Sequence, residues 1–383
     1  MNKVIALVDC DSFFVACEQV RDTGLLGLPV CVLSNNDGCV VSRSKEAKAV
    51  GVKMGMPFFM AKKEFPEVIY KTGDKDFYEE VSAKVMAKLK TYAPQVQVYS
   101  IDEAFIDLTG TSRLYNKTYE EIVRMIRSEV MAETGIPVSI GLASSKTLAK
   151  LASDKAKKNA GVYIVEENDI LPLLKSTKIE EIWGIGRNLT LKLQRKGILN
   201  AYEFVTKSDE FLKSYLGVVG LNLKHELLGE CISAVSSEEE VPQSIQHTSA
   251  LKEFSMDKNV LKTALNKHIH SACRKLRLHG LLTSKIGVML RTKDFQVTSV
   301  SRDLTESTNF ELEIQKTVFE LFEQLYRPNI MYRSTGVILA DFESEDCKQL
   351  PLLSQGEDKK DSLARCIDKI ESKFGKNKIR TGF

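Results

Sequence analysis

Apolar and polar positions along the first 165 residues predict strands separated by helices. Residues 3–8 form a short and almost wholly apolar run, and residues 28–34 and 138–142 form similar runs, too short for helices. Residues 75–92 and 119–133 repeat their apolar positions with the helical period, which is typical of amphipathic helices. Strands that alternate with helices predict one α/β domain here.

Shorter elements complete this first region. Within residues 96–108, apolar and polar side chains alternate on both sides of Asp102-Glu103, which predicts two strands that meet at a tight turn. Residues 12–20, 42–50 and 144–158 are expected to be helices. Ser42 and Arg43 are expected at the N-terminus of the second of these helices, where backbone amides favour anions.

Residues 170–235 change character, because they are helical and punctuated by glycine. Within them, residues 182–186 (IWGIG) precede a helix that is expected to continue to Leu193. Glycine-apolar-glycine between helices resembles a helix-hairpin-helix element, whose loop amides contact a DNA phosphate. A simple turn between two helices is the alternative. Residues 236–240 (SSEEE), followed by Pro242, indicate a linker.

Residues 244–343 predict a second, smaller α/β domain. Strands are expected at residues 247–254, 284–291, 296–304 and 334–342, with helices at 260–278 and 314–325. A further helix is expected near residues 361–374.

Charge is unevenly distributed in this chain of 383 residues. The net charge is only +3, but residues 244–302 hold eleven Lys and Arg against three acids, and four of the five histidines. A local positive excess indicates a polyanionic partner for this region, with a solvated charged surface as the alternative.

Length and composition limit the number of domains and the class of protein. The length predicts two to four domains, and 43% hydrophobic residues is ordinary for a globular chain. The longest stretch without a charge, residues 24–36, is too short to span a membrane, and the N-terminus does not resemble a signal peptide. Eight cysteines without a CxxC pair predict reduced thiols in a cytoplasmic protein and no zinc site.

Three acidic residues are the candidate metal-binding residues of the first region. Asp9 ends the first strand, and Asp102 and Glu103 occupy the predicted turn. Carboxylates that converge at a sheet edge favour Mg²⁺, and two such ions are the machinery of nucleotidyl transfer. Exposed turn acids are the alternative.

Lysines and aromatic residues near these acids extend the hypothesis. Cations near the three acids match a bound triphosphate, although each lysine alone could serve solubility; they are Lys45, Lys48, Lys146, Lys150 and Lys157. Phe13 and Phe14 follow Asp9, and either could pack on the sugar of a nucleotide or belong to the core.

Six short motifs follow one another along the chain: DCDSFF at residues 9–14, SNNDGCVV at 34–41, KEAK at 45–48, GVKMG at 51–55, SIDEAF at 100–105 and WGIG at 183–186. Together they resemble the Y-family translesion DNA polymerases, most closely the UmuC branch, the catalytic subunit of DNA polymerase V. The resemblance covers nearly the whole chain and is densest before residue 165.

The resemblance implies a right-handed α/β polymerase. Its domains would be a palm at residues 1–170 with fingers inserted at about 20–73, a helical thumb with the helix-hairpin-helix at 171–240, a small α/β little finger at 244–345, and a tail at 346–383. The basic excess would lie along duplex DNA in the little finger.

The family's functional residues transfer to matching positions. Asp9, Asp102, Glu103 and the Cys10 carbonyl would bind two Mg²⁺, and Phe14 would be the steric gate that excludes ribonucleotides. Lys48 and Lys157 would bind the triphosphate of a deoxynucleotide, while Lys45 stands where related branches often have tyrosine.

The tail segment Gln349–Leu353 resembles the motif by which bacterial polymerases bind the sliding clamp, with Gln349, Leu350, Leu352 and Leu353 in contact. Primer-template DNA is the main expected partner, and relatives suggest a UmuD-like dimer and RecA. The expected function is error-prone translesion synthesis in an SOS-type response. The alternatives are a non-catalytic DNA- and clamp-binding scaffold and another palm-type enzyme, such as a nucleotidyl cyclase.

Overall fold

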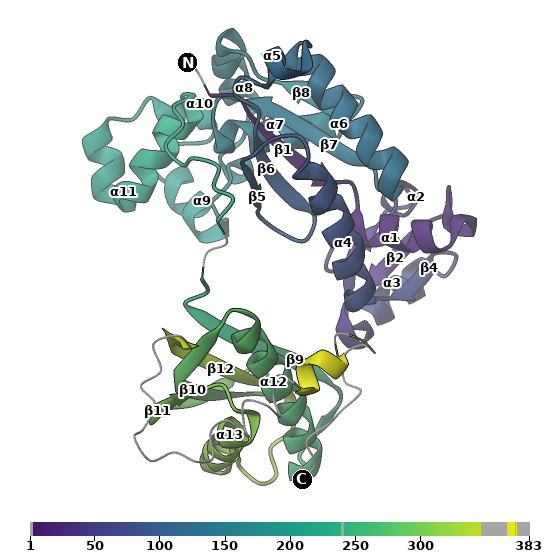
Figure 1. Ribbon diagram of the computed structural model, residues 1–383, viewed down its shortest axis with the longest axis vertical. Helices are drawn as coiled ribbons and strands as arrows, with labels where there is room; N and C mark the ends of the chain where they lie inside the picture. The colour runs from purple at the N-terminus through teal and green to yellow at the C-terminus, as the bar shows by residue number, and fades with distance from the viewer. Residues whose placement is uncertain (1–2, 239–240, 346–365, 372, 374–383) are drawn as a thin grey trace. The chain divides into compact units, whose positions relative to one another are not determined.

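The computed structural model describes residues 3–238, 241–345, 366–371 and 373 (Figure 1). The chain divides into two compact units, Met1–Glu239 and Glu240–Phe383. The division falls in the polar stretch in which the sequence indicates a linker.

A five-stranded sheet forms the centre of the first unit. Its central strand β1 pairs antiparallel with β6 on one side and with β7 on the other. Both β1 and β7 are buried along their whole length, which explains why their sequences are apolar runs and do not alternate. The strand order is β5-β6-β1-β7-β8, with bounds Val96–Val98, Glu103–Asp107, Ile5–Cys10, Val138–Ala143 and Val162–Ile164.

Helices cover both faces of this sheet. Alternate β1 residues enter two separate cores: Ala6 and Val8 pack with helices α4 and α6, whereas Ile5 and Leu7 pack with α7. The helices are α4 (Lys75–Leu89), α6 (Tyr119–Thr134) and α7 (Lys146–Ala156).

Helix α7 approaches β7 unusually closely. A Cβ atom added to Gly141 would lie 2.1 Å from the Ser153 backbone nitrogen and 2.3 Å from the Ala149 carbonyl oxygen. Only glycine fits at this position, because any side chain would collide with helix backbone.

A smaller sheet with order β3-β2-β4 follows helix α1 (Phe13–Arg21). One prediction is corrected here: Ser42 and Arg43 do not begin a helix but end strand β3, which pairs antiparallel with β2. Helix α2 begins at Lys45, because the Ser44 hydroxyl caps it by accepting a hydrogen bond from the Ala47 amide. The bounds are β2 Val30–Leu33, β3 Val40–Arg43, β4 Ile69–Thr72, α2 Lys45–Ala49 and α3 Phe58–Glu64.

Short helices complete the first unit, as the glycine-punctuated sequence predicts. In the longest of them, α11, Gly217 has a φ of 71° and breaks the helical backbone. The helices are α5 (Thr111–Tyr115), α8 (Ile170–Ser176), α9 (Arg187–Gln194), α10 (Ala201–Val205) and α11 (Asp209–Leu227).

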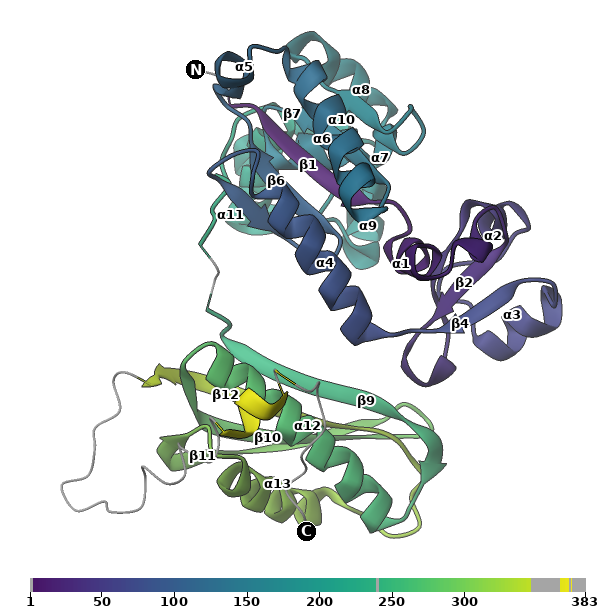
Figure 2. The ribbon, with the colours of Figure 1, turned by 45° about the vertical axis from the view of Figure 1, so that its right-hand side comes forward.

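The second unit is a four-stranded antiparallel sheet of order β11-β10-β12-β9, with helices α12 and α13 on one face (Figure 2). Each strand and helix predicted for residues 244–343 is present, with ends that differ by a few residues. The bounds are β9 Ser244–Ser255, α12 Lys258–Leu278, β10 Leu281–Thr292, β11 Val297–Thr308, α13 Glu311–Leu325 and β12 Tyr332–Ser344.

Two predictions concern the tail, of which the structure describes only part. Of the helix expected near residues 361–374, residues 366–371 are described and are helical. The clamp-like segment Gln349–Leu353 lies outside the described residues.

Two further observations concern membranes and thiols. Within the described ranges, none of the helices is both long enough and apolar enough to cross a bilayer. The seven cysteines described are all free thiols, and four of them are buried.

Candidate active site

The acids singled out in the sequence meet at one edge of the central sheet. Asp9 and Glu103 are direct partners in the pairing of β1 with β6. The amide of Cys10 donates a hydrogen bond of 2.9 Å to the carbonyl oxygen of Asp102, so Asp102 lies beside the end of β1. Residues almost one hundred positions apart are therefore neighbours because two strands pair in this register.

Helix α7 supplies cations to these acids. The Lys157 ammonium, from the residue that caps α7, lies 2.8 Å from Asp9 Oδ2, and Lys150 Nζ lies 3.7 Å from the same oxygen. Lys150 also donates a hydrogen bond to Glu103. The close approach of α7 to Gly141 therefore brings two ammonium groups to two carboxylates.

Burial strongly affects Asp9, which is only 5% exposed. Desolvation, reinforced by its hydrogen bond with Glu103, raises the pKa of Asp9 to about 6, although Lys157 opposes the shift. Burial also raises the pKa of Asp11, against the lowering effect of the Ser139 hydroxyl that donates to it at 2.8 Å. The effect of burial on these two carboxyl groups therefore outweighs the opposing effects of Lys157 and Ser139.

The donor set fits a hard divalent cation, since it consists of carboxylate oxygens beside the end of β1. The side chains are not closed around one point: among the described residues, no group of three His, Cys, Asp or Glu is arranged to hold an ion. Asp102 instead accepts a hydrogen bond of 2.5 Å from the Ser100 hydroxyl. In this structure the three carboxylates thus accept hydrogen bonds from two lysine ammonium groups and from a serine hydroxyl.

The two phenylalanines after Asp9 have different environments. Phe13 is buried in the core, which favours the core interpretation that the sequence left open for it. Phe14 is only partly buried and stacks on Tyr78, with ring centroids 4.9 Å apart. Phe14 is therefore the one of the pair that can present a ring edge to a ligand.

A lysine from helix α2 lies close to the start of α1. Lys48 Nζ donates a hydrogen bond of 3.0 Å to the hydroxyl of Ser12, a residue in the left-handed conformation with a φ of 50°. Burial lowers the pKa of Lys48, and Arg43 adds to this effect. Lys45 is exposed at the first position of α2.

Ser42 has a structural role in the strand where it lies. Its hydroxyl is buried, donates to the Ser12 carbonyl oxygen at 3.2 Å and accepts from the Val15 amide at 3.4 Å. Ser42 therefore ties β3 to the start of α1 and does not present a helix N-terminus to a ligand.

Sequence reasoning missed a buried carboxylate that anchors α7. Glu226, in α11, accepts hydrogen bonds from three backbone amides: Thr147 at 3.0 Å, and Ile232 and Ser233 at 2.9 Å each. A carboxylate at a helix N-terminus is favoured by the helix dipole. Nothing in the local sequence distinguishes Glu226 from the exposed acids around it.

The glycine-punctuated loop is attached to the acid-bearing hairpin by aromatic side chains. Trp183 lies 5.2 Å from Tyr99 and 5.8 Å from Phe105, measured between ring centroids, and its indole N–H donates to the Tyr99 hydroxyl. The loop at residues 183–186 is thus positioned by the same β5–β6 hairpin that carries Asp102 and Glu103.

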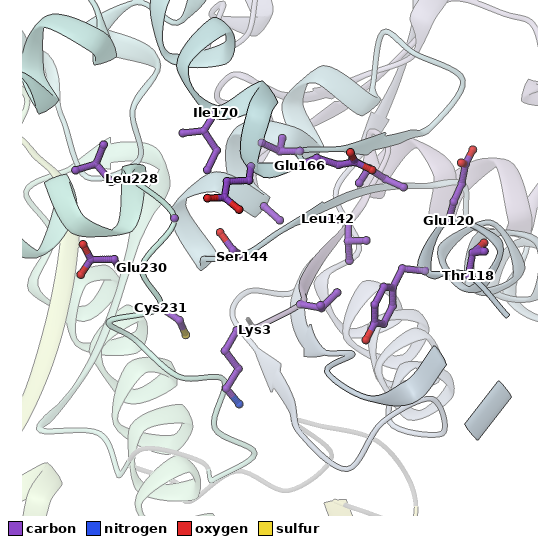
Figure 3. A pocket seen from close by; sticks show the side chains of 17 residues that line it. Lys3, Thr118, Glu120, Leu142, Ser144, Glu166, Ile170, Leu228, Glu230 and Cys231 are labelled. Atoms are coloured by element: carbon purple, nitrogen blue, oxygen red, sulfur yellow. The ribbon is translucent and has the colours of Figure 1, made fainter. Parts of the chain in front are cut away.

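A pocket of about 860 Å³ lies at the opposite end of β1 from these acids (Figure 3). Lys3 and Val4, which precede β1, line it together with Leu142, Glu166 and Glu230. Because β1 runs between the two places, this pocket is separate from the acid-bearing edge.

Comparison with known proteins decides the family. A profile described as the impB/mucB/samB family matches residues 8–154, and the profile of its C-terminal domain matches residues 242–352. The protein UmuC of Salmonella typhimurium is 32% identical over 98% of this chain and 92% of its own length. The chain belongs to the impB/mucB/samB family.

Other relatives support the same conclusion. DNA polymerase IV 1 of Bacillus subtilis is 32% identical over 100% of this chain and 93% of its own length. Among solved structures, a Y-family polymerase chimera of Dbh and Dpo4 matches with a TM-score of 0.75 at 28% identity, covering 89% of this chain and 99% of the other. The insertion ternary complex of Dbh DNA polymerase matches with a TM-score of 0.59 at 26% identity, over the same shares.

These findings confirm the predicted family, fold and enzyme class. The chain is a DNA-directed DNA polymerase of the Y family, with the right-handed polymerase fold, and its function is the damage-tolerant synthesis of this family.

Proposed function

We propose that this polymerase inserts deoxynucleotides opposite damaged template bases at the edge formed by Asp9, Asp102 and Glu103. The observation that carries the proposal is the direct pairing of Asp9 with Glu103, beside the ammonium groups of α7. An edge with buried acids favours cations and the phosphates that accompany them.

Asp9, Asp102, Glu103 and the carbonyl oxygen of Cys10 would hold two Mg²⁺ ions. Such ions activate the attacking hydroxyl and neutralise the departing pyrophosphate when they are bound. The raised pKa of Asp9 supports this assignment, because it shows that a further positive charge would stabilise the ionised carboxylate.

Lysines and Phe14 would position the deoxynucleotide. Lys48 and Lys157 reach the start of α1 and the end of β1 from different elements, so a triphosphate between them would gain charge-assisted hydrogen bonds from both. Lys45 would add a more distant positive charge. The partly buried ring of Phe14 would leave no room for a 2′-hydroxyl.

The domain roles follow from the family. Residues 1–170 would be the palm, with fingers at about 20–73, residues 171–240 the thumb, and residues 244–345 the little finger that binds primer-template DNA. Gln349, Leu350, Leu352 and Leu353 would bind the sliding clamp. A UmuD-like dimer and RecA would act as accessory partners.

Primer extension across an abasic template site tests the catalytic assignment. Asp102→Ala should reduce extension by on the order of 10³-fold, because several kcal/mol of charge stabilisation are removed. Glu64→Ala, which removes an exposed acid from α3, is the matched control and should extend normally. Equal extension by wild type and Asp102→Ala would refute the assignment.

A further inference from the structure

Two irregularities of the sheet in the second unit converge on Arg333. Along β10, consecutive residues Arg291 and Thr292 pair with Ser334 and Tyr332, so Arg333 is an extra residue in β12. Along β9, the four residues 251–254 lie opposite Arg333 alone. Bulges of this kind re-aim side chains and are common beside functional sites.

The hairpin between β10 and β11 carries a third irregularity. Phe295, at its tip, has a φ of 67°, in the left-handed region that glycine and asparagine adopt readily. This backbone costs a residue with a bulky side chain about 1–2 kcal/mol. The residue is also 64% exposed, so burial does not explain the presence of phenylalanine at this position.

The ring of Phe295 contacts Arg333. The guanidinium carbon of Arg333 lies 3.8 Å from the centroid of Phe295 and 5.5 Å from that of Phe254, whose side chain is 42% exposed. Phe254 belongs to the four residues that bulge opposite Arg333. Two rings and a planar cation therefore form one exposed surface, here called the Arg333 platform and made of Phe254, Phe295 and Arg333.

The charged residues near the Arg333 platform indicate which class of ligand it would bind. Six of the eleven cations at residues 244–302 form ion pairs within the second unit: Lys258, Lys262, Arg274, Arg277, Lys285 and Arg302. Three of the others make no ion pair with any residue that the structure describes: Lys252 in the bulge, Arg291 near the end of β10 and Lys293 just after it. Together with Arg333 they outnumber the two acids of the same segments, Glu253 and Asp294. Exposed π-faces within this positive excess match the bases and phosphates of an unpaired strand.

We propose that the Arg333 platform binds single-stranded DNA by stacking an unpaired base on Phe295, while Lys252, Arg291 and Lys293 neutralise phosphates. This site lies within the second unit and is additional to both the catalytic edge and the contacts of this unit with a duplex. It gives a physical reason for the strained phenylalanine, since an aromatic ring offers a stacking face that glycine and asparagine lack.

Binding measurements on the full chain test the proposal. Phe295→Asn keeps a residue that tolerates the left-handed backbone but removes the ring. Its affinity for a fluorescently labelled oligodeoxythymidine, measured by anisotropy at fixed salt, should fall about fivefold or more, the low end of one lost base stack. Affinity for a blunt duplex should not change. Phe295→Tyr should bind both DNAs like wild type.

Thermal unfolding separates this role from a structural one. Phe295→Asn should unfold at the same or a higher temperature than wild type, because the strain on the backbone is relieved. Leu278→Ala removes an exposed apolar side chain at the end of α12 and is the matched control, with unchanged binding of either DNA.

Three outcomes would overturn the proposal. One is an unchanged affinity of Phe295→Asn for single-stranded DNA, and another is an equal loss for single-stranded and duplex DNA. The third is unchanged DNA binding together with reduced stimulation by an accessory protein, which would assign the Arg333 platform to a protein partner.

Discussion

Replacing Glu226 by alanine should destabilise the first unit strongly. The substitution leaves the buried amide of Thr147 without its acceptor, and it also removes the acceptor of the Ile232 and Ser233 amides, which belong to exposed residues. An unsatisfied buried amide costs about 1–3 kcal/mol, and water can reach the other two amides, so the total cost should be about 3 kcal/mol. A loss of about 3 kcal/mol corresponds to roughly 6–12 °C in the melting temperature of a unit of this size.

Urea unfolding followed by tryptophan fluorescence measures this effect selectively. Trp183 is the single tryptophan of the chain and lies in the first unit, so its signal reports that unit alone. Glu226→Gln should lose about half as much stability, because one acceptor oxygen remains. Since α7 carries Lys150 and a lysine at its end, primer extension by Glu226→Ala should also fall below wild type at permissive temperatures.

The matched control for Glu226 is Glu230→Ala. Glu230 lies four residues away, is exposed and forms an ion pair with His225 at the surface, so its loss should change stability by less than about 0.5 kcal/mol. If Glu226→Ala unfolds within about 1 kcal/mol of wild type, the three amides have found other partners and the reasoning is refuted.

Other predictions concern the gate, the second unit and the tail. Phe14→Ala should raise ribonucleotide incorporation, measured as the ratio of extension with ribonucleotides and deoxynucleotides, and an unchanged ratio would reject the gate. The hydrogen bond with Glu311 raises the pKa of His270 above its unfolded value of about 6.5. The protonated His270 therefore stabilises the second unit fully below about pH 6.5. This stabilisation is lost as the pH rises through the pKa of His270 in the folded protein. Thermal unfolding should therefore show a loss of stability above about pH 6.5 that His270→Gln abolishes, whereas identical pH profiles would contradict it. Replacing Leu350 and Leu352 by alanine should reduce clamp-stimulated synthesis and spare basal synthesis; an equal fall in both would indicate a structural role.

Much of the fold was predictable because strands and helices leave local patterns. The apolar run of β1 and the helical period of α4 and α6 depend only on which faces are buried. Ser42 was assigned to the wrong element because β3 has only four residues and a single residue, Ser44, separates it from α2, so one short stretch contains both patterns.

The identities of the candidate residues were predictable from the sequence, but most of their contacts were not. Asp9, Asp102 and Glu103 were found because acids beside apolar runs are conspicuous. The ion pairs of Lys150 depend on how α7 crosses the sheet, and the contact of Glu226 with Thr147 joins residues 79 positions apart. Counting charges likewise revealed the basic region but not that about half of its cations are paired internally.

Gly141 has no functional group, yet it limits how far this enzyme can vary. An alanine there would usually be regarded as a conservative exchange, but its methyl group would push α7 away from the sheet. The helix would withdraw its two ammonium groups from the acids they neutralise. A substitution that changes only the packing of one strand would thus impair DNA synthesis in the same way as the loss of the two lysine charges, although no ionisable residue had been replaced.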